Sequence, residues 1–233
     1  QDVFDSVITR MPATLKLAAF SMLLALVVSV PLGILAALKH NSIWDSLATA
    51  LATVGVSLPK FWFGLVLMIV FSLRLGWLPS TGSAELSEGL GTFLSYIIMP
   101  AASLALGMAA TQTRMIRSSM LDVLNQDYVR YARSKGLRER VVIWGHALKN
   151  AMIPVITVIG GEVGGLLGGA VVTESIFSWP GVGRLMMNSI SKRDYPMIQG
   201  ITLMLCISYL LVNLLIDIVY AWVDPRIRLD KKS

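Results

Sequence analysis

Two ionisable side chains, Lys60 and Glu162, stand within long runs of apolar residues. A charge at membrane depth is costly unless it faces water, a partner or a ligand, so both residues are candidates for lining a pathway. Lys60 follows Pro59 and suits a carboxylate, whereas Glu162 lies among glycines and suits a cation. Snorkelling of Lys60, or an ion pair between the two residues, explains Lys60 equally well without a role in binding.

The chain offers no group of residues arranged for catalysis or for metal binding. Its two histidines, His40 and His146, share no helix face with a cysteine or an acidic cluster. No nucleophile, base and orienting group stand at a suitable spacing, and the glycine-rich segment 160–169 lacks the Gly-Lys-Ser/Thr ending of a phosphate-binding loop. Cys206 is expected to be a buried packing residue. We therefore expect no catalytic residue, no metal site and no cofactor bound by this chain.

Composition places the chain among integral membrane proteins. Hydrophobic residues make up 55% of it and charged residues 15%, and the mean hydropathy is +0.69. The apolar residues gather in runs long enough to cross a bilayer as helices, unlike the short alternating segments of a membrane barrel. We expect one all-α, polytopic helical bundle over residues 1–233, with spans at about 13–38, 48–73, 93–113, 151–172 and 201–223.

The placement of Lys and Arg predicts the topology. Positive charge gathers at Lys39, in the connector 114–150 and in the C-terminal tail, and it marks the cytoplasmic side of a membrane protein. We therefore expect the connector and the C-terminus in the cytoplasm and Gln1 outside. An outside start without a signal sequence suggests that at least one further span precedes this chain.

The outside connector 173–200 is too rich in apolar residues to be a plain solvated loop. Phe177 and Trp179 suit the membrane interface, and Pro180-Gly181 suits a tight turn before a short helix that contains Arg184. We interpret the segment as a periplasmic, gate-like element. An anchor without any gating role fits these residues equally well.

Several separated motifs make this chain resemble the permease subunits of ABC importers, the inner membrane components of binding-protein-dependent transport. The motifs are the connector 127–154, the outside stretch 174–184, Arg193-Asp-Tyr-Pro196 and Asp224-Pro-Arg226. They occur in the expected order, and the resemblance covers essentially the whole chain. It is greatest for the dipeptide, oligopeptide and nickel branch.

The resemblance implies that the connector 114–150 holds a short coupling helix that docks on an ATPase subunit. The family pattern is Glu-Ala-Ala, three residues and Gly; Ala132 and Gly136 match it, whereas Arg130 and Tyr131 depart from it. A small Ala132 lets another protein come close, and Gly136 ends the helix in a left-handed conformation. Alternatively, the charges only fix the topology. The coupling candidates are Asp127, Tyr128, Arg130, Tyr131, Ala132, Arg133, Lys135 and Gly136.

The resemblance also implies a set of partners and a function. They are a second permease subunit, two cytoplasmic ATPases that bind ATP and Mg²⁺, an extracytoplasmic binding protein and the lipid of a bacterial or archaeal inner membrane, with no nucleic acid. This chain then forms the pathway and is not an enzyme. Peptides are the first expectation for the cargo because Lys60 suits a carboxylate, and nickel or a metal chelate is the alternative. An ion-coupled secondary transporter or channel would need no such connector and should show inverted repeats, of which the sequence has no convincing example.

Overall fold

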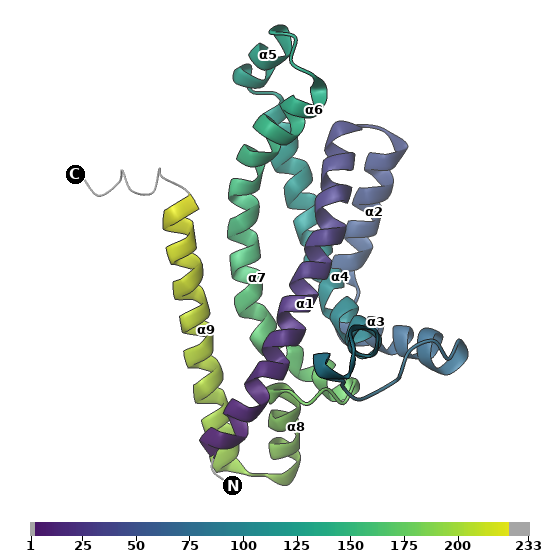
Figure 1. The fold of residues 1–233 in the computed structure, drawn as a ribbon, viewed down its shortest axis with the longest axis vertical. Helices are drawn as coiled ribbons and strands as arrows, with labels where there is room; N and C mark the ends of the chain where they lie inside the picture. Colours follow the sequence, from purple (N-terminus) through teal and green to yellow (C-terminus); the bar gives the residue numbers. More distant parts are fainter. Residues whose placement is uncertain (1–2, 224–233) are drawn as a thin grey trace, which may run out of the picture.

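The computed structural model describes residues 3–223, with side chains placed throughout except at 167, 169, 217 and 219–223. Every regular element in this range is a helix (Figure 1), which confirms the all-α prediction. The elements are α1 (Val3–Leu38), α2 (Ile43–Ser57), α3 (Lys60–Leu67), η1 (Met68–Arg74), η2 (Leu86–Glu88), α4 (Leu90–Leu124), α5 (Asp127–Ser134), α6 (Glu139–Val141), η3 (Val142–Ala147), α7 (Leu148–Ile176), α8 (Val182–Lys192) and α9 (Tyr195–Val223). The motif at 224–226 and the tail expected in the cytoplasm lie outside the described residues.

The long helices supply the membrane crossings. Four of them are long and apolar enough to span a bilayer, and a fifth crossing exists if the bent pair of α2 with α3 and η1 is counted as one span. The boundaries differ from the predicted ones: α1 begins at Val3, and α4 continues to Leu124. Arg114 and Arg117 therefore lie on a long helix rather than in the connector.

A sharp break separates α2 from α3. The two halves meet at an angle of 103°, and α3 with η1 runs sideways out of the bundle (Figure 1). Pro59 has no backbone N–H and disfavours helical geometry at the residue before it, and Leu58 is accordingly extended, with φ −80° and ψ 130°. Pro59 thus interrupts the predicted run 48–73 and leaves Lys60 at the start of a new helix.

Close packing of α1 against α4 forms the centre of the bundle. Small residues line this contact, and α7 joins the same apolar core. A Cβ atom at Gly33 would lie 2.7 Å from the Ile116 Cβ atom, so these two helices approach more closely than any larger residue would allow. The central alanines are Ala18, Ala25, Ala101, Ala105 and Ala109.

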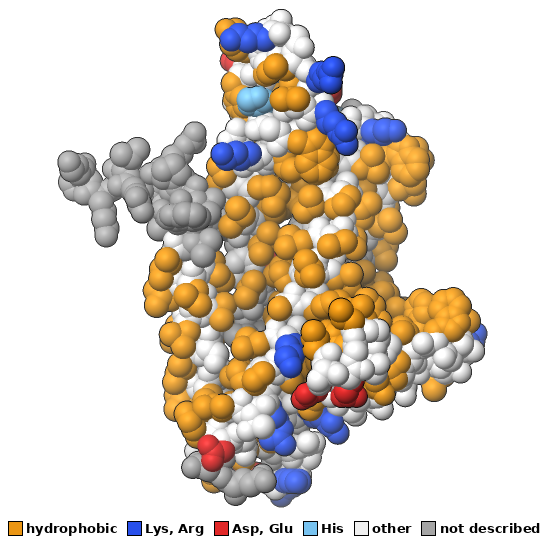
Figure 2. All heavy atoms as spheres, viewed as in Figure 1, with side chains coloured by type: hydrophobic (Ala, Val, Ile, Leu, Met, Phe, Trp, Pro, Cys, Tyr) orange, Lys and Arg blue, Asp and Glu red, His pale blue; other side chains and the backbone are white. Residues whose placement is uncertain are grey.

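The outside of the bundle is apolar along most of its length. Figure 2 shows hydrophobic side chains over the middle of the molecule and Lys and Arg side chains gathered near α5 and α6. Helix α9 touches α7 closely at Gly164, where an added Cβ atom would lie 2.6 Å from the Tyr209 ring. Its other side exposes Leu203, Ile207, Leu210, Leu211, Leu214, Leu215 and Ile218. Such a surface is stable in lipid and not in water.

Candidate functional site

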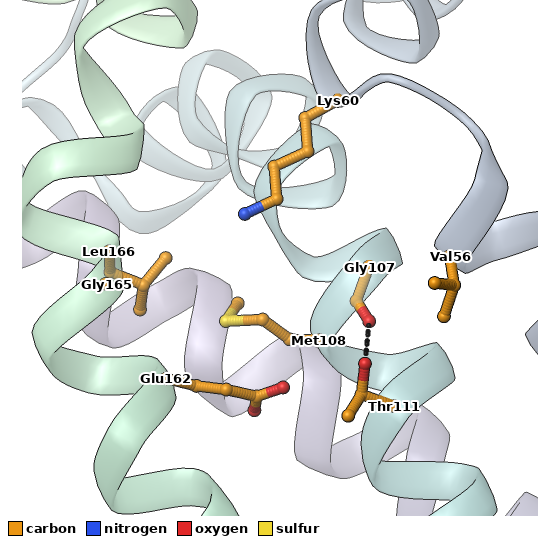
Figure 3. Close-up of a pocket in the computed structure, with 8 residues that line it drawn as sticks. All are labelled: Val56, Lys60, Gly107, Met108, Thr111, Glu162, Gly165 and Leu166. Carbon is orange, nitrogen blue, oxygen red and sulfur yellow. Dashed lines mark hydrogen bonds between the residues drawn. The ribbon is translucent and has the colours of Figure 1, made fainter.

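A cavity in the middle of the bundle brings the two pathway candidates to the same place. It has a volume of about 330 Å³, and both Lys60 and Glu162 line it (Figure 3). The break at Pro59 places Lys60 here, and the Ser103 hydroxyl fixes the backbone by donating a 3.0 Å hydrogen bond to the Lys60 carbonyl. The Lys60 stem passes over Gly107, where an added Cβ atom would lie 3.6 Å from the Lys60 Cε atom. The remaining lining residues are Val56, Gly107, Met108, Thr111, Gly165 and Leu166.

Glu162 is held from behind by a chain of polar side chains. The Gln112 amide donates a 2.7 Å hydrogen bond to its carboxylate, and the Ser29 hydroxyl donates a 2.9 Å bond to the Gln112 carbonyl oxygen. Ser29 and Gln112 are fully buried. These bonds join α1, α4 and α7 and orient the carboxylate towards the cavity. Ser29 and Gln112 each interrupt an apolar run, and this interruption is the signal in the sequence by which they could have been found.

Lys60 and Glu162 point into the cavity from opposite sides (Figure 3). Among the ion pairs of the described residues, none joins these two side chains. The ion-pair explanation raised from the sequence is thus not realised. One positive and one negative group both face the same space.

The short helix α5 stands at the end of the bundle, away from the membrane-length helices (Figure 1). Its surface exposes Tyr128 and Tyr131, at 42% and 62% of their areas. Gly136 has φ +75°, which confirms the predicted left-handed helix end. The Arg133 guanidinium is 2.7 Å from the Glu139 carboxylate, and this hydrogen-bonded contact raises the pKa of Arg133. The remaining predicted coupling residues, Asp127, Arg130 and Lys135, lie on α5 or directly after it and are exposed.

Ala132 does not face outwards. It is 8% exposed and packs with Val129 and Val142 of this same chain. The prediction that Ala132 opens a close approach for another protein is therefore wrong. Its small size instead lets α5 pack against Val142 of η3, the helical segment directly before α7.

The outer segment is buried more deeply than the sequence suggested. Phe177 and Trp179 are each 2% exposed, so the prediction that they sit in the membrane interface is wrong. The Trp179 indole donates a 2.9 Å hydrogen bond to the Ala13 carbonyl on α1, while Phe177 packs over Gly64 on α3. These aromatic residues fasten the turn before α8 to two other helices. Pro180 lies in the turn itself and is exposed.

A buried carboxylate, Glu174, organises the start of α8. The side chain accepts a 2.7 Å hydrogen bond from the Thr14 hydroxyl and a 3.1 Å bond from the Arg184 backbone N–H. The same Thr14 oxygen accepts a 2.9 Å bond from the Val182 N–H. Glu174 has no exposed surface, and a Cβ atom at Gly181 would collide with its carboxylate. The glycine there therefore makes room for a carboxyl group at a helix N-terminus.

Arg184 contributes to this turn through its side chain as well. Its guanidinium donates a 2.7 Å hydrogen bond to the Ser178 carbonyl, and Ser178 has a positive φ of 54°. Arg184 thus stabilises an unfavourable backbone conformation within the segment. Sequence analysis singled out Arg184 but neither Glu174 nor Thr14. The hydrogen bond between Glu174 and Thr14 joins residues 160 positions apart, and no local pattern indicates it.

A second buried carboxylate, Asp45, lies at the opposite end of the bundle. Arg117 on α4 donates two hydrogen bonds to it, the Nη2 bond being 2.8 Å long. The Asn41 backbone N–H and the His40 ring also contact Asp45, at 3.0 and 3.1 Å. This cluster ties the turn between α1 and α2 to α4, and sequence analysis did not foresee it.

Residues considered for metal or redox chemistry lie apart. Among the side chains that the structure describes, no three of His, Cys, Asp or Glu form a group that could hold a metal ion. His40 contacts Asp45, and His146 is on η3. Cys206 is exposed on α9, so its prediction as a buried residue is wrong.

A polytopic bundle with ionisable groups facing a central cavity is consistent with a membrane transport protein. Residues 29–229 match the family described as "Binding-protein-dependent transport system inner membrane component". The chain belongs to this family, which confirms the resemblance seen in the sequence. Because the chain belongs to this family, it is an importer permease and not an ion-coupled secondary transporter or channel.

Curated relatives match nearly the whole chain. The oligopeptide transport system permease protein AppB of Bacillus subtilis is 44% identical over 97% of this chain and 72% of its own length. The dipeptide transport system permease protein DppB of Escherichia coli is 42% identical over 97% of this chain and 74% of its own length. The di/tripeptide permease DppB of Pseudomonas aeruginosa is 42% identical over 98% and 74%.

Solved structures of ABC transporters share the fold. One is the inward-facing MetNI methionine ABC transporter, with a TM-score of 0.76 and 15% identity over 93% of this chain and 95% of that chain. Another is an amino acid ABC transporter with histidines, with a TM-score of 0.66 and 15% identity over 96% and 94% of the two chains. At this identity the likeness concerns the fold alone.

Proposed function

We propose that this chain forms half of the translocation pathway of an ATP-driven importer of dipeptides and oligopeptides. The observation that carries the proposal is the placement of Lys60 and Glu162 on opposite sides of one cavity. A free peptide ends in a carboxylate and an ammonium group, which are complementary to these two charges. The peptide permeases among the relatives support the same cargo.

The exposed face of α5 is the proposed contact with a cytoplasmic ATPase. Tyr128, Arg130 and Tyr131 present aromatic and positively charged surface there, and such residues are enriched in protein interfaces. Ala132 supports α5 from within. Gly136 ends α5 just beyond that surface.

The partners of this assembly are a second permease, two ATPases that hold ATP and Mg²⁺, and an external binding protein. We place the assembly in the inner membrane of a bacterium or archaeon, with α5 in the cytoplasm. ATP hydrolysis then belongs to the ATPase subunits and transport to the permease pair. No observation favours nickel over a peptide as the cargo.

The segment 173–200 is the proposed outer gate element. Its turn is fastened through Trp179 to α1 and through Phe177 to α3, and Glu174 holds the beginning of α8. Helix α8 therefore moves together with α1 and α7 rather than as a free loop. Pro180, Gly181 and Arg184 maintain the turn that makes this possible.

Uptake measured with end-blocked peptides tests the charge assignment. The complete importer in proteoliposomes should take up a free dipeptide only with ATP and the external binding protein. Lys60→Met should slow free and N-acetylated peptides but not C-terminal amides, whereas Glu162→Gln should slow free peptides and amides but not N-acetylated ones. Each rate is compared at equal occupancy of the binding protein, because the blocked peptides must first bind to it.

Two results would contradict the proposal in different ways. A wild-type importer that moves no peptide would refute the cargo. Peptide uptake that neither variant alters would support the peptide as cargo but show that this cavity is not part of the pathway.

A further inference from the structure

The central cavity continues towards the end of the bundle that carries α5. A second cavity of about 610 Å³ shares Val56 and Thr111 with the first. A third cavity, of about 600 Å³, shares Thr49 and Arg117 with the second. Adjacent cavities with common walls form one row along α2 and α4.

One face of α4 follows the first two cavities of this row. Gly107, Thr111, Arg114 and Ser118 all line these cavities, and their spacing of three or four residues puts them on one side of a helix. At 1.5 Å per residue this stripe is about 16 Å long, which is roughly the length of an extended peptide of four or five residues. Thr111 and Ser118 add hydroxyl groups to the wall.

The two arginines near the inner end of the row differ in their surroundings. Arg117 is bound to the buried Asp45, so its charge is already neutralised. Arg114, which lies one turn earlier and lines the second cavity, is exposed. Among the described residues, the recorded ion pairs leave the Arg114 guanidinium unpaired. Of the two arginines that line the second cavity, Arg114 is therefore the one whose guanidinium can meet an anion.

We infer that Arg114 is a second station for the carboxylate of the cargo, reached after the peptide leaves Lys60. The inference rests on the peptide function proposed above. A guanidinium binds a carboxylate through two parallel hydrogen bonds, and Lys60 and Arg114 then form successive positive sites along one wall. The phosphate of an anionic lipid offers similar oxygen atoms, so the experiment must separate a peptide carboxylate from a lipid headgroup.

Uptake by the complete importer in vesicles of pure phosphatidylcholine provides the test. Arg114→Gln should slow uptake of a free dipeptide by roughly tenfold, the effect of losing one charged hydrogen bond, and should leave its C-terminal amide unchanged. Arg114→Lys should restore much of the rate, because it keeps the charge. The matched control is Lys149→Gln, which removes an exposed charge from α7 and should not alter the ratio of free to amidated peptide.

Three results would overturn the inference. Equal slowing of the free and amidated peptides would assign Arg114 a structural role. A defect that occurs only when phosphatidylglycerol is added would assign it to lipid. A wild-type importer that moves neither peptide would refute the peptide function itself, and with it this station.

Discussion

Thr14 on α1 donates a 2.7 Å hydrogen bond to Glu174 near the C-terminal end of α7, and both side chains are buried. The carboxylate also accepts the Arg184 N–H at the start of α8. Three helices thus meet at one acidic group. Its oxygen atoms are held by hydrogen-bond donors of α1 and of the start of α8 rather than by a basic side chain.

The room for this carboxylate depends on Gly181. We expect Gly181→Ala to reduce the free energy of unfolding by about 1–3 kcal/mol, because the added methyl group collides with Glu174. Thermal unfolding of the purified complex in detergent measures the change. Gly91→Ala is the control, since no atom lies within 4 Å of its added Cβ. Equal melting temperatures for the two variants would contradict the assignment.

The two sides of α5 should respond differently to substitution. Ala132→Leu overfills the contact with Val129 and Val142, and we expect it to expose α5 to proteolysis and to abolish copurification with the ATPase. Tyr131→Ala removes exposed surface only, so it should leave the protease pattern unchanged while it weakens copurification. Limited proteolysis and ATPase capture measure both effects. A Tyr131→Ala variant that binds the ATPase normally would move the contact elsewhere.

Buried Asp45 and partly exposed Arg117 should be strongly coupled. We expect Asp45→Asn or Arg117→Gln alone to cost about 3–5 kcal/mol, because each leaves a charged partner uncompensated, and the double variant to cost less than their sum. The exposed pair Arg133 and Glu139 is the control, with an expected coupling of about 0–1 kcal/mol. Chemical unfolding of the single and double variants completes a double-mutant cycle for each of the two pairs. Additive effects at Asp45 and Arg117 would contradict this view.

Gln112 is the central member of the polar chain behind Glu162. Gln112→Leu should lower stability by about 1–3 kcal/mol, because it leaves the carboxylate of Glu162 and the buried Ser29 without their partner. Ser29→Ala removes one outer bond and should cost less. Unfolding experiments compare the two variants. A larger loss with Ser29→Ala would show that the chain is organised differently.

The sequence correctly predicted the features that depend on a few neighbouring residues and on the surrounding lipid. Apolar runs must be helical in lipid, and Gly136 suits a left-handed helix end. These features are present in the structure. Local chemistry was sufficient because each depends on only a few neighbouring residues.

What the sequence missed depends on contacts between distant segments. Aromatic residues suit both a membrane interface and a protein core, and only the position of α1 and α3 decides that Trp179 and Phe177 are buried. The direction of Ala132 likewise depends on Val142, which follows after the turn. Helical periodicity alone did not specify which side of α5 would be covered.

Helix α7 joins three sites in one continuous rod. Near its beginning lies the contact with α5, Glu162 stands along its length, and Glu174 sits close to its end. A tilt of this rod displaces its ends in opposite directions and the middle very little. Glu162 beside the cavity is therefore the acidic group of α7 that such a tilt displaces least.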